Sequence, residues 1–324
     1  MSGWRGAGDH RGVVVLDPAI IELIDAMSTP PTLRQLGPQD GRIALREAQQ
    51  TLREHPGTTA RFHTAEVGPA GLTGLWVIRP RHAEGPLPTV FYLHGGRWMF
   101  GDADTHAHVV SELAVGAGVA MVVPEYSRTP EARYPVALEE CYAALLWVHA
   151  NADDLHLDVT SIALAGDCAG ATIATAVAML AKSRGGPRLR AQLLYYPPTD
   201  AACDSASHRE FGDGYLLSSA EQAWYWNQYC DGDRTCPTVS PLYARPEDLT
   251  GLPPTMVVTA EADVVRDEGA DFARNLRRAG VDVTALRYLG TVHDFVVLSR
   301  LAEIAPARAA IAQGSWFLRE RLHA

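Results

Sequence analysis

The chain has 324 residues, of which 47% are hydrophobic and 20% are charged, and its formal net charge is −10. This is the composition of a globular protein long enough for one large domain with a small appendage. The negative charge argues against a nucleic-acid partner, and no apolar stretch is long enough to cross a bilayer. Residues 1–5 lack the long apolar segment and the cleavage site that a signal peptide needs, so none is expected.

The cysteines predict a reducing, cytoplasmic location. Their number is odd, and no two of them form the C-x-x-C pair that is typical of structural zinc. The five are Cys141, Cys168, Cys203, Cys230 and Cys236.

The predicted elements begin with helices. Residues 1–16 look like a loose arm, and Asp17 followed by Pro18 is typical of a helix start. A second helical run covers about 40–53. Because these helices precede the first strand, we expect residues 1–57 to lie outside the sheet as an N-terminal arm and cap.

From residue 58 onward, strands and helices alternate, which predicts an α/β fold with a mostly parallel sheet covered by helices on both faces. Strands are expected at 59–67, 72–78, 89–93, 119–124, 161–165, 192–196, 255–260 and 281–288, and helices at 107–117, 136–150, 169–182, 269–279 and 302–322. Residues 200–235 lack a strand pattern and are rich in aromatic residues. We interpret them as a cap insertion in a catalytic domain that spans 58–324.

A predicted strand, a sharp turn and a helix meet at Cys168. The sequence Gly166-Asp167-Cys168-Ala169-Gly170 has the spacing of the G-x-S-x-G nucleophile elbow, with sulfur in place of oxygen. A Cβ atom on either glycine would crowd such a turn, and the helix N-terminus favours a thiolate. Taken alone, the motif is equally compatible with a buried structural cysteine.

Two candidate partners follow in the chain. A nucleophile needs a base, and the base needs an orienting acid. Asp263 comes just after one predicted strand and His293 just after the next, in the α/β-hydrolase order of nucleophile, acid and histidine. A helix N-cap at Asp263 and a core or surface role for His293 are the alternatives. The order and the strand-end placement together favour the triad.

Backbone donors for an oxyanion are also predicted. His94-Gly95-Gly96 follows a strand and matches the H-G-G-G type of loop found in esterases and lipases. We expect the N–H groups of Gly95, Gly96 and Ala169 to form the oxyanion hole. The alternative is a plain glycine turn.

Together these motifs resemble the hormone-sensitive-lipase family of α/β-hydrolases, the bacterial carboxylesterases with an N-terminal cap. The resemblance implies the α/β-hydrolase fold, esterase activity on a small-molecule acyl substrate, a cap-covered pocket and no cofactor. By position, Cys168 takes the place of the nucleophilic serine, His293 that of the base and Asp263 that of the acid. The matching segments are His94-Gly95-Gly96, Gly101-Asp102, Asp104-Thr105-His106, Pro124-Glu125-Tyr126-Ser127-Arg128, Tyr134-Pro135-Val136-Ala137-Leu138-Glu139, Gly166-Asp167-Cys168-Ala169-Gly170, Asp263, Arg266-Asp267-Glu268-Gly269 and His293-Asp294-Phe295.

Three positions depart from the family pattern. Cys168 replaces serine, Arg97 replaces the third glycine of the oxyanion loop, and Asp294 replaces the glycine after the histidine. We hypothesise that the Arg97 guanidinium binds a substrate carboxylate in a bidentate manner; an arginine turned to solvent is the alternative. Asp294 competes with Asp263 as a partner of His293 or adjusts its charge.

Other candidates concern the pocket and metals. Trp98 and Phe295 are expected to contact substrate, and at least one of Trp224, Tyr225 and Trp226 is expected to pack inside the cap, since neighbouring helical positions point in different directions. The cluster of Asp102, Asp104, His106 and His108 fits metal ligands only loosely, so no metal is expected.

The cysteine leaves several functions open. We favour hydrolysis of a carboxylic ester, lactone or thioester, because the triad, the loop and the cap are otherwise intact. The alternatives are acyl transfer, lactonisation, cyclisation or elimination in the same site, or an engineered Ser-to-Cys variant of a serine esterase. A non-catalytic binding protein is disfavoured because all three triad positions carry usable groups. A homodimer is left open.

Overall fold

The computed structural model describes residues 14–27, 30–49 and 55–324. Most of the arm expected at 1–16 therefore lies outside the described residues. No helix in the described part of the chain is both long and apolar enough to cross a membrane.

In the described residues, eight strands form one sheet in the order β1-β2-β4-β3-β5-β6-β7-β8. The β1–β2 and β2–β4 pairs are antiparallel, and the other five pairs are parallel. The expectation of a mostly parallel sheet is thus confirmed. The strands are β1 (Thr58–Ala65), β2 (Thr73–Pro80), β3 (Leu87–Leu93), β4 (Ala120–Glu125), β5 (Leu157–Asp167), β6 (Leu189–Tyr195), β7 (Thr255–Ala262) and β8 (Val283–Val292).

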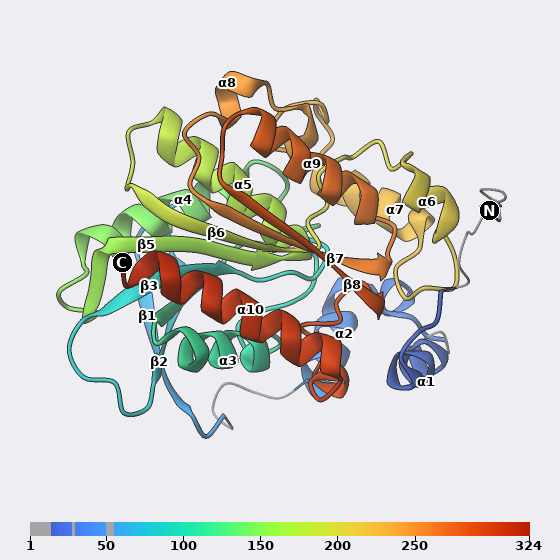
Figure 1. Cartoon of the computed structure of the whole chain (residues 1–324), viewed down its shortest axis with the longest axis horizontal. Helices are drawn as coiled ribbons and strands as arrows, with labels where there is room; N and C mark the ends of the chain where they lie inside the picture. Colours follow the sequence, from blue (N-terminus) through green and yellow to red (C-terminus); the bar gives the residue numbers. More distant parts are fainter. Residues whose placement is uncertain (1–13, 28–29, 50–54) are drawn as a thin grey trace, which may run out of the picture.

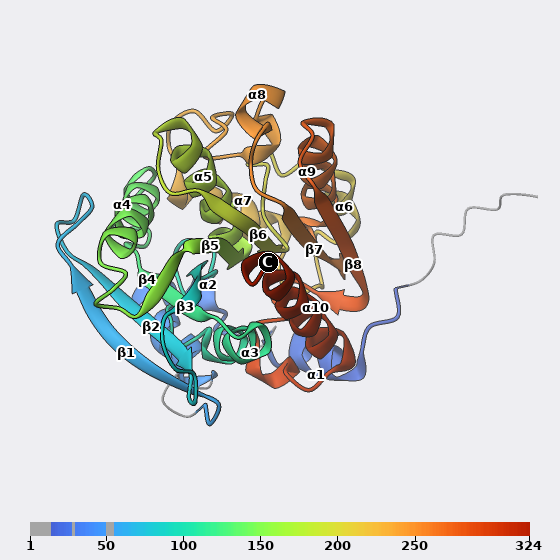
Figure 2. The same ribbon diagram turned by 60° about the vertical axis from the view of Figure 1, so that its left-hand side comes forward.

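Helices cover both faces of this sheet (Figure 2). On one face lie α3 (Ala107–Ala117) and α10 (Ala305–Leu322), and on the other lie α4 (Val136–Ala150), α5 (Cys168–Ser183) and α9 (Arg266–Arg278). The central strands are buried on both faces, as a parallel sheet with two helical layers requires. Short helical turns complete the chain at α8 (Pro246–Leu249), Pro241–Tyr243 and Ser299–Leu301.

The remaining helices gather at the end of the sheet to which β7 and β8 point (Figure 1). They are α1 (Pro18–Met27), α2 (Leu33–Glu47), α6 (Ala206–Glu210) and α7 (Ser219–Tyr229). Because ligands of open parallel sheets bind beyond the carboxyl ends of the strands, these helices lie where they can bound a substrate site.

The first two helices show what the sequence did and did not predict. The Asp17 carboxylate accepts from the Ala19 N–H at 3.0 Å, so the predicted cap is confirmed. The second helix was expected at 40–53 but begins at Leu33, because Thr32 and Gln35 form a reciprocal capping box. It bends at Gly37, whose φ is +78°. Residues 50–54 lie outside the described part.

Candidate active site

Cys168 stands at the sharp junction between β5 and α5. Its φ is +48°, an unfavourable backbone conformation for a residue with a side chain. A Cβ at Gly166 would lie 2.7 Å from the Gly170 carbonyl, and one at Gly170 would overlap the Leu93 and His94 carbonyls. Both glycines are therefore needed for the close approach of backbone segments, as the motif predicts.

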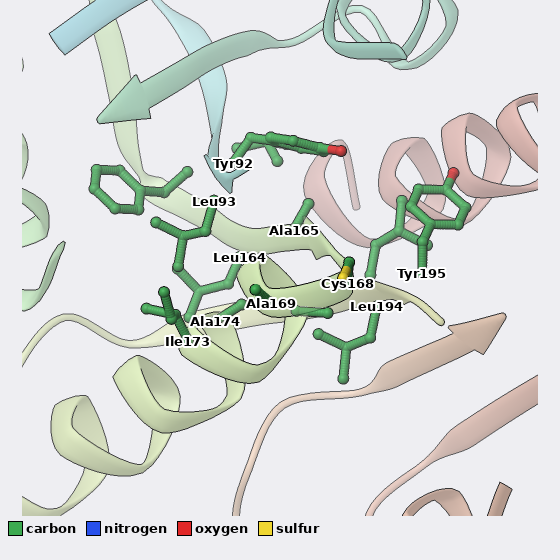
Figure 3. Packing of buried hydrophobic residues seen from close by; sticks show 14 of the residues in the cluster. Tyr92, Leu93, Leu164, Ala165, Cys168, Ala169, Ile173, Ala174, Leu194 and Tyr195 are labelled. Carbon is green, nitrogen blue, oxygen red and sulfur yellow. The ribbon is translucent and has the colours of Figure 1, made fainter. Parts of the chain in front are cut away.

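The surroundings of Cys168 are apolar on the sheet side. Figure 3 shows it at the start of α5, with Tyr92 and Leu93 of β3 and Leu194 and Tyr195 of β6 nearby. Its side chain is wholly buried, so substrate access to the sulfur requires some neighbouring group to move.

Asp263 and His293 form a buried pair at the ends of β7 and β8. Asp263 Oδ2 lies 2.8 Å from His293 Nδ1, while Oδ1 accepts from the Val265 N–H at 3.1 Å. The same carboxylate thus orients the imidazole and holds the turn before α9, whose N-cap is Val265 rather than Asp263, so the helix-cap reading of Asp263 is wrong. Nearby Glu261 instead accepts from the Gly290 N–H at 2.6 Å.

The other nitrogen of His293 faces the candidate nucleophile. Ligand atoms of Cys168, His293 and Asp294 all lie within 4.8 Å of one another, and His293 Nε2 has no hydrogen-bond partner. Burial disfavours the charged imidazole, but the negative charges of Asp263, Cys168 and Asp294 outweigh burial and raise the pKa of His293 well above its usual value. A proton can pass between Sγ and Nε2 after a small side-chain movement.

Gly95 corrects one expectation about the oxyanion hole. Its N–H donates to Asp167 Oδ1 at 3.0 Å and approaches His106 Nε2 at 3.1 Å, so it is already used inside the protein. The Asp167 carboxylate also accepts from the Tyr92 hydroxyl at 2.7 Å. Gly95 therefore anchors the loop to the nucleophile elbow and is not free to bind an oxyanion.

Three other N–H groups remain available beside the nucleophile. Those of Gly96 and Arg97 donate no hydrogen bond to the described part of the chain. The N–H of Ala169 lies in the first turn of α5, where a helix offers no acceptor. Gly96, Arg97 and Trp98 all have positive φ, and this unusual run gives the loop its sharp course.

The two charged departures from the family pattern form an ion pair that the sequence analysis missed. Arg97 Nη2 lies 3.3 Å from Asp294 Oδ2, while Asp294 Oδ1 lies 3.6 Å from His293 Nε2. Burial acts to lower the pKa of Arg97, but Asp294, Tyr225, Cys168 and Glu221 together outweigh burial and the pKa rises. The sequence did contain a signal for this ion pair: two residues of opposite charge replace glycines of the family pattern, both in loops that flank the triad.

A cavity of about 260 Å³ lies next to Arg97, beneath the helices at the end of the sheet. It is lined by Met27, Thr32, Leu33, Arg97, Asp213, Gly214, Tyr215, Leu216, Ser218, Glu221 and Tyr225. A narrow crevice next to it borders Gly96, Arg97 and Asp294. Neither reaches Cys168 or His293, and Arg97 borders both spaces.

The aromatic candidates are mostly buried. Trp98 is 1% exposed and stacks on Tyr229 at a centroid distance of 4.6 Å, and Phe295 is wholly buried near Tyr196. Neither borders the two spaces described above, and Cys168 and His293 do not border them either, so the substrate contact of Trp98 and Phe295 stays a prediction. Tyr225 lines the cavity. Trp226 packs inside the cap against Trp98, as expected for at least one of the three aromatic residues.

The acidic and histidine cluster after the oxyanion loop serves the fold. Asp102 accepts from Arg46 Nε at 3.0 Å and from the Thr105 N–H at 2.8 Å, and His106 faces Asp167 at 3.3 Å. Among the described residues, the group of three potential metal-binding side chains is instead Cys168, His293 and Asp294.

Comparison with known proteins identifies the family of the chain. A family model described as the alpha/beta hydrolase fold matches residues 90–297. Carboxylesterase NlhH of Mycobacterium tuberculosis is 37% identical over 318 residues, covering 95% of this chain and 97% of that protein. The carboxylic ester hydrolase LipN of the same organism is 37% identical over 308 residues, covering 90% and 81%. The crystal structure of a thermostable esterase from Pseudomonas putida superposes with a TM-score of 0.91 at 36% identity, covering 96% of this chain and 99% of that one. The chain therefore belongs to the α/β-hydrolase family, and these relatives are esterases.

Proposed function

We propose that this enzyme hydrolyses carboxylic esters, or the related lactones and thioesters, with Cys168 as the nucleophile. The observation that carries the proposal is the buried Asp263–His293 pair at 2.8 Å, whose free Nε2 faces the cysteine. The esterase relatives support the reaction class. The role of the cysteine rests on the geometry alone.

The steps follow from these positions. His293 Nε2 takes the proton of Cys168, and the thiolate attacks the acyl carbon. The N–H groups of Gly96, Arg97 and Ala169 hold the oxyanion. His293 then gives its proton to the leaving oxygen or sulfur, which leaves a thioester on Cys168. Water activated by His293 attacks this thioester, and the acid and the free thiol are restored.

A thiolate nucleophile narrows the choice of substrate. The tetrahedral intermediate expels the better of its two leaving groups, and a thiolate leaves more easily than an alkoxide. Simple alkyl esters therefore return to reactants unless His293 protonates the alkoxide in time. We infer that aryl esters, enol esters, strained lactones and thioesters are turned over faster than alkyl esters.

The substrate cavity is proposed to be closed by two segments that together form the cap. Residues 1–57 contribute Met27, Thr32 and Leu33, and the insertion near 200–235 contributes Glu221 and Tyr225. A volume of about 260 Å³ is near the lower end for ligand sites and favours a short acyl chain.

Arg97 is proposed to bind a polar group of the substrate. One of its amino groups faces Asp294, and the guanidinium lies 5.8 Å from the Tyr225 ring at the cavity wall. Its remaining donors are candidates for a substrate carboxylate. The test compares a half-ester of a dicarboxylic acid with a neutral ester of equal length. Arg97→Ala should raise KM for the half-ester alone; an unchanged KM removes the idea.

The main experiment compares hydrolysis of p-nitrophenyl acetate and ethyl acetate by the wild type, Cys168→Ser and Cys168→Ala. The wild type should hydrolyse the aryl ester and the alanine variant should not. Replacement by serine should improve the alkyl ester relative to the aryl ester, because the alkoxide disadvantage disappears. A wild type no faster than the alanine variant contradicts hydrolysis by Cys168.

Acyl transfer is the second candidate, and the complete burial of Cys168 favours it, because a thioester shielded from water survives long enough to meet another acceptor. It predicts a stable acyl-enzyme that is discharged by an added thiol, amine or alcohol faster than by water. Discharge at the same rate with and without acceptors rejects it.

A further inference from the structure

We propose that Cys168, His293 and Asp294 form a binding site for a thiophilic divalent cation of the zinc type, and that the bound ion reversibly inhibits the enzyme. The juxtaposition is that of one sulfur, one nitrogen and one carboxylate oxygen, all within 4.8 Å of one another. These are the three donor types that proteins use for zinc. The expectation that no metal acts as a cofactor is unaffected, because this ion binds the Cys168 sulfur and blocks the reaction instead of assisting it.

The spacing is close to that of a tetrahedral site. At ordinary zinc–ligand distances, neighbouring ligand atoms are about 3.3–3.6 Å apart. His293 Nε2 and Asp294 Oδ1 are already separated by 3.6 Å. The sulfur lies within 4.8 Å of its two partner ligand atoms, so a small approach of the Cys168 side chain completes the spacing. Three protein ligands leave the fourth position to water.

One atom of this group needs a partner. His293 Nε2 is buried and has no hydrogen-bond partner, although the ring is held rigidly through its other nitrogen. An unpartnered buried nitrogen is costly, and a metal ion satisfies it more completely than a cysteine at this distance.

Two outer partners orient the ligands. Asp263 accepts from Nδ1 of His293, which gives the carboxylate–histidine–metal arrangement found in zinc proteins. Arg97 holds the second oxygen of Asp294 at 3.3 Å and leaves Oδ1 turned toward the histidine. The side chains of His293 and Asp294 are therefore already oriented by their neighbours without a bound ion.

The charges also balance. A thiolate at Cys168 and the carboxylate of Asp294 neutralise a divalent cation, and the outer pair of Asp263 and Arg97 cancel each other. A buried ion needs such neutralisation, because an unpaired charge is very costly away from water. Binding releases the thiol proton, so it weakens as the pH falls. With the ion on Sγ, the thiolate no longer attacks an acyl carbon.

The test uses the full chain freed of metal with a chelator and involves no substrate. Zinc chloride is titrated calorimetrically, and cobalt(II) chloride is added to detect the thiolate-to-cobalt charge-transfer band in the near ultraviolet. Protection of Cys168 from iodoacetamide by zinc is followed by peptide mass spectrometry. The wild type should bind one ion per chain, show the band and be protected.

The variants make the assignment specific. Asp294→Gly should weaken zinc binding at least tenfold; it relieves the positive φ of 63° at that position but removes the partner of the buried Arg97, so a Tm measurement checks that the variant is folded. Cys168→Ser should abolish the cobalt band. The matched control is Cys236→Ser, which removes a half-buried thiol beside Thr238 and should leave binding unchanged.

Three outcomes overturn the proposal: no calorimetric or spectral change in the wild type, unchanged affinity in Asp294→Gly, or a band that persists in Cys168→Ser. None of them depends on ester hydrolysis, so the zinc site and the proposed function succeed or fail separately. If the chain proves to be an esterase, zinc should inhibit it and a chelator should restore its activity, with inhibition weakened in parallel in Asp294→Gly.

Discussion

Replacing Asp263 by asparagine tests how the base is oriented. The carboxylate accepts two hydrogen bonds in different directions, from His293 Nδ1 on Oδ2 and from the Val265 N–H on Oδ1. A side-chain amide has only one acceptor oxygen. If that oxygen stays on the Val265 N–H, the amide NH2 group faces Nδ1, and His293 must carry its proton on Nε2, where it cannot receive the proton of Cys168.

The magnitude follows from this conflict. A triad with the wrong histidine tautomer loses about 10⁴-fold in kcat even though its geometry is intact. If the amide rotates to serve His293 instead, the hydrogen bond from the Val265 N–H is lost, at about 1 kcal/mol of stability. We therefore expect kcat/KM for p-nitrophenyl acetate to fall by about 10²–10⁴-fold, with a modest fall in Tm.

Glu261→Gln is the matched control. Glu261 lies two residues earlier, near the end of β7, and its carboxylate accepts from the Gly290 N–H rather than from the histidine. Its variant should keep kcat/KM within a few-fold of the wild type. An Asp263→Asn enzyme within tenfold of the wild type, or an equal loss in both variants, refutes the role given to Asp263.

The remaining predictions concern the elbow and a buried ion pair. Gly170→Ala should lower the free energy of unfolding by about 3 kcal/mol, because the added Cβ meets two backbone carbonyls. Gly232→Ala is the control and should be neutral, because a Cβ there meets open space. Denaturant unfolding measures both variants, and equal losses of stability contradict the packing argument. Burial raises the pKa of Glu268 to about 7 despite the nearby His208. A carboxyl whose folded pKa is raised adds stability that is complete below about pH 4.5 and is lost as the pH rises through about 7. At about 1.4 kcal/mol per pKa unit, Glu268→Gln should remove up to about 3 kcal/mol of this pH dependence in Tm scans from pH 5 to 8, and parallel scans for both proteins contradict it.

Local pattern was enough to predict the elements that bear the site. The elbow, the order of Asp263 and His293, and the parallel sheet follow from glycine spacing and from alternating strands and helices. The start of α2 is also visible in the sequence as a capping-box pattern at Thr32 and Gln35.

Tertiary contacts decided what local pattern did not. Gly95 lost its expected role because the Asp167 carboxylate, 72 residues away in sequence, takes its N–H. The Arg97–Asp294 pair joins loops 197 residues apart, and no short-range rule brings them together. Trp98 turned into the core because the aromatic side chains of α7 receive it.

The central claim is that the acyl group passes through the sulfur of Cys168. The most direct measurement is mass spectrometry of the acid-quenched protein after brief mixing with p-nitrophenyl acetate, followed by peptide mapping. We expect one acetyl group on the peptide that carries Cys168, bound as a thioester that hydroxylamine removes, and none in Cys168→Ala. Sustained turnover with no acetyl group on Cys168, or turnover retained in Cys168→Ala, would contradict the account.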